Sequence, residues 1–274
     1  MKRRLTIKER LLNSLENNYL FVAGWLIFGS IAIVIQIFNY SSLIKQKYNE
    51  TFGSTQVEYN KINKLSTNVH ISNITKVLGE PTTMNDYDKD DNLKEYIFVN
   101  KLYYVDVLTN HDEKVLSYAV TSREKTFMPT FSRPPVQYNG EPLSITLNKS
   151  TLKDVSPTIE KTNYSTYPTC KVLFGVRRFW YFEGLYDGNP DDYQSVYYGI
   201  NDAGYIQNWD NISSLAQQIG FESSNCSDIS EDFRRAATIN TFMITAPFEF
   251  MALESSKAAN IKFGVDSDEV RVIN

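Results

Sequence analysis

Histidine and cysteine are scarce in this chain, which has only two of each among 274 residues. His70 and His111 lie in polar stretches, so we interpret both as solvated side chains and not as general acids, bases or metal ligands. The sequence also lacks C-x-x-C, H-E-x-x-H, G-x-S-x-G, P-loop and G-x-G-x-x-G patterns. We therefore expect no catalytic residue, no metal site and no cofactor.

Clusters of positive charge are also missing from most of the chain. The formal net charge is -4, and the first 18 residues carry five basic and two acidic side chains, which leaves -7 for the rest. Nucleic acids and anionic lipid surfaces bind clustered lysine and arginine. This charge distribution excludes nucleic acid as a partner.

One long apolar run is present, residues 19–38, which contain no charged side chain. A helix of this length spans about 30 Å, the thickness of the hydrocarbon core of a bilayer. Basic residues dominate before the run, which predicts a cytoplasmic N-terminus (1–18) and an exported remainder. No Ala-x-Ala cleavage pattern follows, so we interpret 19–38 as an uncleaved transmembrane anchor in contact with the lipid bilayer. Its small residues also allow a homodimer.

The two cysteines, Cys170 and Cys226, both fall in the part that we expect to be exported. An even number of cysteines in an oxidising compartment is typical of a disulfide, so this pair is a candidate. Two separately buried thiols fit the sequence equally well.

Residues 39–66 are polar with scattered apolar positions, and we interpret them as a stalk. A first α+β unit is predicted over 67–125. Ser72 or Asn73 can cap a short helix that Gly79 and Pro81 end. An acidic turn at 86–92 is followed by strand-like segments at 94–100, 102–109 and 114–122, and Asn110–Glu113 resembles a hairpin turn.

Residues 126–142 contain four prolines and read as a linker. The second unit, 143–274 with a C-terminal extension, begins with a helix capped by Ser150 or Thr151 and continues with strand-like runs at 171–186 and 193–200. The predicted fold class is α+β, an antiparallel sheet with short helices, and the pattern suggests two repeated helix-plus-meander units.

Aromatic side chains crowd two of the strand-like runs, and we take four of them as a candidate binding surface: Trp180, Tyr181, Tyr197 and Tyr198. Glu183 follows the first pair, and such a carboxylate could serve a glycosidase if a second one stood near it. Asp86, Asp88 and Asp90 begin like a calcium loop, but Asp91 and Ile97 occupy the positions that need Gly and Glu. We interpret that stretch as a solvated turn.

The stretch ISNITKVLGEP (71–81), with strands ending in YAVTS (118–122), resembles the SmpA/OmlA-type module of bacterial envelope proteins. That module packs a short helix ending in Leu-Gly-x-Pro on an antiparallel sheet. This chain lacks the module's usual aromatic pair after the proline. The runs YYGINDAGY (197–205), RRAATINTFMITAP (234–247) and FGVDSDEVR (263–271) resemble an uncharacterised family of bacterial single-span envelope proteins. The resemblance implies the bacterial inner membrane as the location.

These observations favour a non-enzymatic binding or scaffold protein of the cell envelope, with an envelope or membrane protein as its partner. Two alternatives stay open. One is a hydrolase of envelope glycans or peptides that uses Glu183 and Asp187. The other is a sensor that signals through the helix to a membrane partner.

Overall fold

The computed structural model describes residues 6–9, 54–88, 92–132, 144–155, 169–174, 179–187, 194–217, 222–223, 229–246 and 262–271. The chain divides into two units, residues 1–57 and 58–274. The expected span 19–38 lies outside the described residues. Among the helices that are described, none is long and apolar enough to cross a membrane.

Short helices alternate with longer strands in the described chain. The helices are α2 (Ser54–Ile62), α3 (Ile71–Leu78), α4 (Leu152–Val155), α5 (Trp209–Gln217), α6 (Glu231–Ala236) and α8 (Ser267–Arg271). The strands are β1 (Thr83–Asp88), β2 (Leu93–Val99), β3 (Tyr103–Thr109), β4 (Val115–Ser122), β5 (Thr130–Ser132), β6 (Ser144–Thr146), β7 (Thr169–Phe174), β8 (Phe179–Asp187), β9 (Gln194–Asn201), β10 (Glu222–Ser223) and β11 (Thr241–Thr245).

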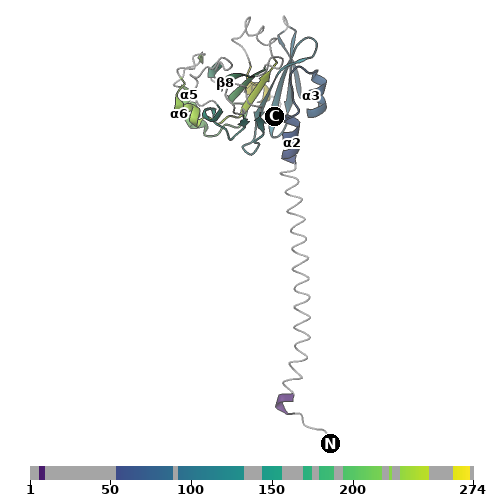
Figure 1. Cartoon of the computed structure of the whole chain (residues 1–274), viewed down its shortest axis with the longest axis vertical. Helices are drawn as coiled ribbons and strands as arrows, with labels where there is room; N and C mark the ends of the chain where they lie inside the picture. The colour runs from purple at the N-terminus through teal and green to yellow at the C-terminus, as the bar shows by residue number, and fades with distance from the viewer. Residues whose placement is uncertain are drawn as a thin grey trace. The chain divides into compact units, whose positions relative to one another are not determined.

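Nine of these strands form one antiparallel sheet in the order β1-β2-β3-β4-β11-β9-β8-β7-β10. The predicted α+β class with an antiparallel sheet is confirmed. In one half α3 precedes β1–β4, and in the other α4 precedes β7–β9. The halves join where β4 pairs with β11. Figure 1 shows α3 beside the first half and α5 and α6 beside the second.

The two halves share one core, although the prolines of 126–142 had suggested a linker between separate units. Phe127 from that segment is completely buried and stacks on Tyr103 with ring centroids 5.0 Å apart. Further along the segment, β5 pairs with β6 in a second, two-stranded sheet. The part of the expected linker that the structure describes is therefore packed against the domain.

Local signals explain most element boundaries. Ile71 and Ile74 give α3 its buried face, and Gly79 ends the helix with a φ of 94°. The N-cap of α3 is His70, whose side chain accepts a hydrogen bond from the Ser72 N–H, and not Ser72 or Asn73 as expected. At α4, Thr151 is the cap, since its hydroxyl accepts from the Asp154 N–H.

Three expectations from the sequence need correction. The expected stalk reaches into the core, because Ile62 and Leu65 are buried. The expected acidic turn at 86–92 begins inside β1, which pairs with β2. The run 171–186 contains two strands, β7 and β8, which pair with each other. Only the second of these differences comes from a strand that extends into an expected turn.

Both faces of the sheet are covered. On the front face, which we define as the face packed on α2–α6, alternate side chains such as Val105, Tyr181 and Tyr198 form the main core. On the opposite, back face lie Ala119, Trp180, Phe182, Tyr197 and Met243. Residues 262–271, which we call the C-terminal segment, pack on the back face through Phe263, Val265 and Val270.

Candidate functional site

A carboxylate is buried on the front face at the second half of the sheet. Glu183 is 1% exposed and accepts two hydrogen bonds from Arg234 of α6, at 2.6 Å from Nε and 2.8 Å from Nη2. The hydroxyls of Tyr181 and Tyr198 donate to the same carboxylate at 2.8 and 3.1 Å. Four donors therefore surround Glu183, and both of its oxygens are satisfied.

The surroundings of Tyr181 and Arg234 shift the pKa values of both side chains upward. Burial raises the pKa of the Tyr181 hydroxyl well above its ordinary value, and the charge of Glu183 adds to the effect. Burial alone would lower the pKa of Arg234, but its bonds to Glu183 and the charge of Glu183 raise it instead. Tyr181 therefore stays a hydrogen-bond donor and Arg234 stays a cation. The ion pair of Arg234 with Glu183 connects α6 to β8.

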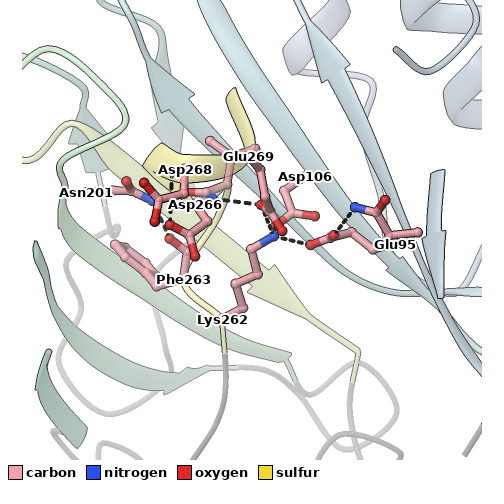
Figure 2. Close-up of polar contacts among 10 residues, drawn as sticks. Glu95, Asp106, Asn201, Lys262, Phe263, Asp266, Asp268 and Glu269 are labelled. Atoms are coloured by element: carbon pink, nitrogen blue, oxygen red, sulfur yellow. Dashed lines mark hydrogen bonds and ion pairs between the residues drawn. The ribbon is translucent and has the colours of Figure 1, made fainter. Parts of the chain in front are cut away.

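A second ionic cluster lies on the back face, where Figure 2 shows the ammonium group of Lys262 among three carboxylates. Lys262 is hydrogen-bonded to Glu95 of β2 and to Glu269 of α8, and its Nζ is 3.7 Å from Asp106 of β3. Asn85 of β1 donates to the other oxygen of Glu95 at 2.9 Å. Lys262 thus links the C-terminal segment directly to β2 and β3, and Glu95 is held in turn by β1.

Negative charge exceeds positive charge in this cluster. Burial raises the pKa of Asp106 well above its ordinary value of 3.8; Lys262 acts in the opposite sense, and Glu95 and Glu269 add to the rise. Burial would lower the pKa of Lys262, but the three carboxylates around it raise it. Asp106 therefore keeps its proton to a higher pH than an exposed aspartate does.

Replacing Asp106 with asparagine should therefore stabilise the fold increasingly as pH rises. In the wild type, the folded state holds a proton on Asp106 that the unfolded chain has lost above about pH 4. The free energy of unfolding of the wild type therefore falls by up to about 1.4 kcal/mol per pH unit until Asp106 ionises in the folded state. Asp106→Asn does not titrate. Denaturant unfolding of the full chain in detergent at pH 5 and pH 7.5 measures the difference.

The matched control for this experiment is Asp112→Asn, because Asp112 is 72% exposed in a hairpin turn. We expect this control to follow the wild type at both pH values. An effect of Asp106→Asn that is the same at pH 5 and at pH 7.5 would mean that Asp106 is already ionised beside Lys262 at pH 5.

Two asparagines join the three sequence runs that the family resemblance singled out. The amide of Asn201 donates to the carbonyls of Phe263 and Val265 at 2.6 and 2.9 Å. Asn240 donates to the carbonyl of Asn201 at 2.7 Å and accepts from its N–H at 2.8 Å. Gly264 has a φ of 76°, and a Cβ there would lie 3.0 Å from the Thr121 hydroxyl. The three runs thus build one structural junction.

The C-terminal segment also stabilises its own conformation. At the start of α8 the N–H of Asp266 donates to Glu269 at 3.0 Å, and Asp266 accepts from the N–H of Asp268 at 3.3 Å. Such reciprocal bonds fix a helix start. Glu269 therefore serves both the helix and Lys262.

The four aromatic residues expected to form a binding surface are buried. Tyr181 and Tyr198 are 0% exposed and bind Glu183 in the core, while Trp180 and Tyr197 are 7% and 4% exposed beneath the C-terminal segment. That prediction is wrong as a description of the free surface, because both faces of the sheet are covered.

Other sequence candidates fall partly outside the described residues. The side chain of Cys170 in β7 and the whole of Cys226 lie outside them, so the disulfide stays a prediction. The side chain of Asp187 and the whole of Asp90 also lie outside the described residues. His70 caps α3, and its ring lies 3.4 Å from the Glu113 carboxylate. His111 is 66% exposed beside Asp112.

The edges of the main sheet are poorly suited to adding another strand. At one edge, β1 has a register irregularity between Asp86 and Asp88. At the other edge, β10 has only two residues. Bulges, acidic side chains and short strands are the features that protect sheet edges from pairing.

Sequence reasoning identified Glu183 but not its partner. Arg234 lies in an Arg-Arg pair on a short helix, and nothing local distinguishes it from Arg235, which is 63% exposed. Lys262 likewise has no neighbouring signal. Only the apolar neighbours of Glu183 marked it as unusual.

A search of protein-family models, of curated proteins and of solved structures finds no match to this chain. The site is therefore interpreted from its own geometry.

Proposed function

We propose that this chain is a single-pass protein of the bacterial inner membrane, anchored by residues 19–38, whose extracytoplasmic α+β domain has a non-enzymatic binding or scaffold role. Its partner is an envelope or membrane protein. The anchor rests on the uncharged run and on the basic residues before it. The resemblance to SmpA/OmlA-type modules and to single-span envelope proteins supports the bacterial setting.

The state of Glu183 is the observation that carries the binding proposal. The alternative, a hydrolase, needs this carboxylate in an open cleft near a second acid. Glu183 is instead enclosed by Arg234 and two tyrosine hydroxyls. The Glu183 carboxylate stabilises the fold through these bonds, so we place the function on the surface of the domain.

The order of elements supports the further interpretation that the domain contains two repeated units. Each half starts with a short helix, continues as an antiparallel meander and meets the other half at the middle of the sheet. Such a sheet offers a rigid platform to a partner.

Fusions of a periplasm-active reporter test the topology. We expect activity when the reporter follows Asn274 and none when it is placed at Asn18, because five basic residues before the span hold the N-terminus in the cytoplasm. The reverse pattern of activity would overturn both the orientation and the compartment.

Crosslinking in native membranes tests the binding role. Formaldehyde treatment of cells that carry the tagged full chain, followed by mass spectrometry, should give the same envelope or membrane protein in replicate purifications. A chain that recovers only lipid and itself would contradict the binding role.

A further inference from the structure

The back face holds the C-terminal segment in the way that a binding domain holds a peptide. An acidic pocket, Glu95 with Asp106, receives the ammonium group of Lys262. The ring of Phe263 stacks on Phe182 with centroids 4.7 Å apart. Peptide-binding domains combine such side-chain pockets with hydrogen bonds to the peptide backbone.

The backbone of the segment is held as well. Asn201 donates to two carbonyls of the segment, those of residues 263 and 265. Gly264 between them lets the chain approach Thr121 closely, since a Cβ would lie 3.0 Å from its hydroxyl. The recognised pattern is a lysine, an aromatic residue and a glycine in succession.

The segment does not satisfy every group on this face. The indole N–H of Trp180 is buried, packs in the same cluster as Phe263 and has no acceptor among the described residues. A buried donor without an acceptor destabilises the arrangement that leaves it so. Glu95 and Asp106, the two carboxyl groups of the face itself, lie against the single ammonium group of Lys262. A ligand that places a carbonyl group beside the Trp180 indole N–H would satisfy this donor as well.

We infer that the back face is a peptide-binding surface for an extended segment of a partner protein, in which a lysine or arginine directly precedes an aromatic residue, and that the C-terminal segment occupies this surface in cis. The inference rests on the proposed binding function. The cation of the partner would lie between Glu95 and Asp106, and its aromatic ring would lie on Phe182. The net charge of -7 in residues 19–274 favours such a basic ligand.

Peptide capture by the full chain in detergent tests this inference. The probe is a fluorescent peptide with the sequence of residues 261–271, and Lys262→Gln in the protein weakens the cis segment. The wild-type cis segment competes at about millimolar effective concentration, so we expect the peptide to bind the Lys262→Gln protein at least about tenfold more tightly than the wild type. Fluorescence anisotropy measures the affinity, and Lys149→Gln, an exposed lysine, is the matched control.

Two further measurements locate the bound peptide. A carbodiimide should join the lysine of the peptide to Glu95 or Asp106, and a peptide with glutamine in place of that lysine should bind at least about tenfold more weakly, because it lacks the cation. If Lys262→Gln does not fold by circular dichroism, Gly264→Ala replaces it as the variant with a weakened cis segment.

Equal peptide binding by the wild type and the weakened variant, or none by a folded variant, would overturn the inference. A carbodiimide link between Lys262 of one copy and Glu95 of another, without peptide capture, would assign the face to a second copy and also overturn it. If a partner is still crosslinked in native membranes, the binding function stands and only its location on the back face fails.

Discussion

Replacing Gly199 with alanine is expected to unfold most of the domain. A Cβ at this position would lie 1.9 Å from the carbonyl oxygen of Tyr181 and 2.7 Å from the Cα of Phe182. Both are backbone atoms of β8, and Gly199 is paired on its other side with Thr241 of β11. The strand cannot move away from one neighbour without disturbing the other, so we expect a loss of about 3 kcal/mol or more in the free energy of unfolding.

Gly79→Ala is the control for that variant. Gly79 also needs attention because its φ is 94°, but a Cβ there meets no atom within 4 Å. With a ψ of -171° this backbone is adopted almost only by glycine, and the strain of alanine there costs about 1–3 kcal/mol. Denaturant unfolding of the full chain in detergent, followed by circular dichroism, compares the two. A Gly199→Ala protein as stable as Gly79→Ala would show that β8 and β9 are not packed as described.

Arg234→Met should have the second largest effect. The variant keeps a side chain of similar length but leaves the carboxylate of Glu183 buried without its cation, at a site where Glu183 is 1% exposed. Breaking a buried ion pair in this way costs about 3–5 kcal/mol. The melting temperature of the full chain should therefore fall sharply, and limited proteolysis should cut the second half of the sheet first.

The neighbouring Arg235→Met is a matched control in the same helix. Arg235 is 63% exposed and its ion pairs with Glu231 and Asp232 are on the surface. Exposed ion pairs contribute little to stability, because water and salt screen them, so this control should unfold almost like the wild type. Similar losses in the two variants would mean that the helix, and not the buried pair, determines the stability.

Much of the first half could be predicted from sequence because its signals are local. Each of β2–β4 is rich in β-branched and aromatic residues, and Asn110 marks the turn between β3 and β4, accepting hydrogen bonds from the N–H groups of Asp112 and Lys114. The helix α3 is bounded by a capping residue and a glycine. Such signals need no knowledge of distant parts of the chain.

The second half was harder to predict because its strands are covered on both faces. Residues 179–182 are consecutive aromatics, and such a run is typical of a strand with two buried faces. Exposed aromatics would give the same run, so the sequence did not distinguish a binding surface from a core. The C-terminal segment makes these aromatic residues part of the core. It contacts Phe182 although it lies about 80 residues further along the chain.

The candidate site depended on long-range contacts for the same reason. Glu183 lies 51 residues from Arg234, and Lys262 lies 167 residues from Glu95. These partners have no characteristic spacing in the sequence. Their elements come close to one another only when the strands assemble in the order of the folded sheet. Their roles could be assigned only from the structure.

The double variant Glu183→Gln, Arg234→Met tests the central claim that Glu183 supports the fold and that the domain acts by binding. The pair becomes neutral, and the amide oxygen of glutamine still accepts from Tyr181 or Tyr198. After circular dichroism confirms folding, formaldehyde crosslinking in native membranes with quantitative mass spectrometry compares its partners with those of the wild type. We expect the same partners in the same amounts. A folded double variant that no longer crosslinks these partners would show that Glu183 takes part in binding, and would contradict this account.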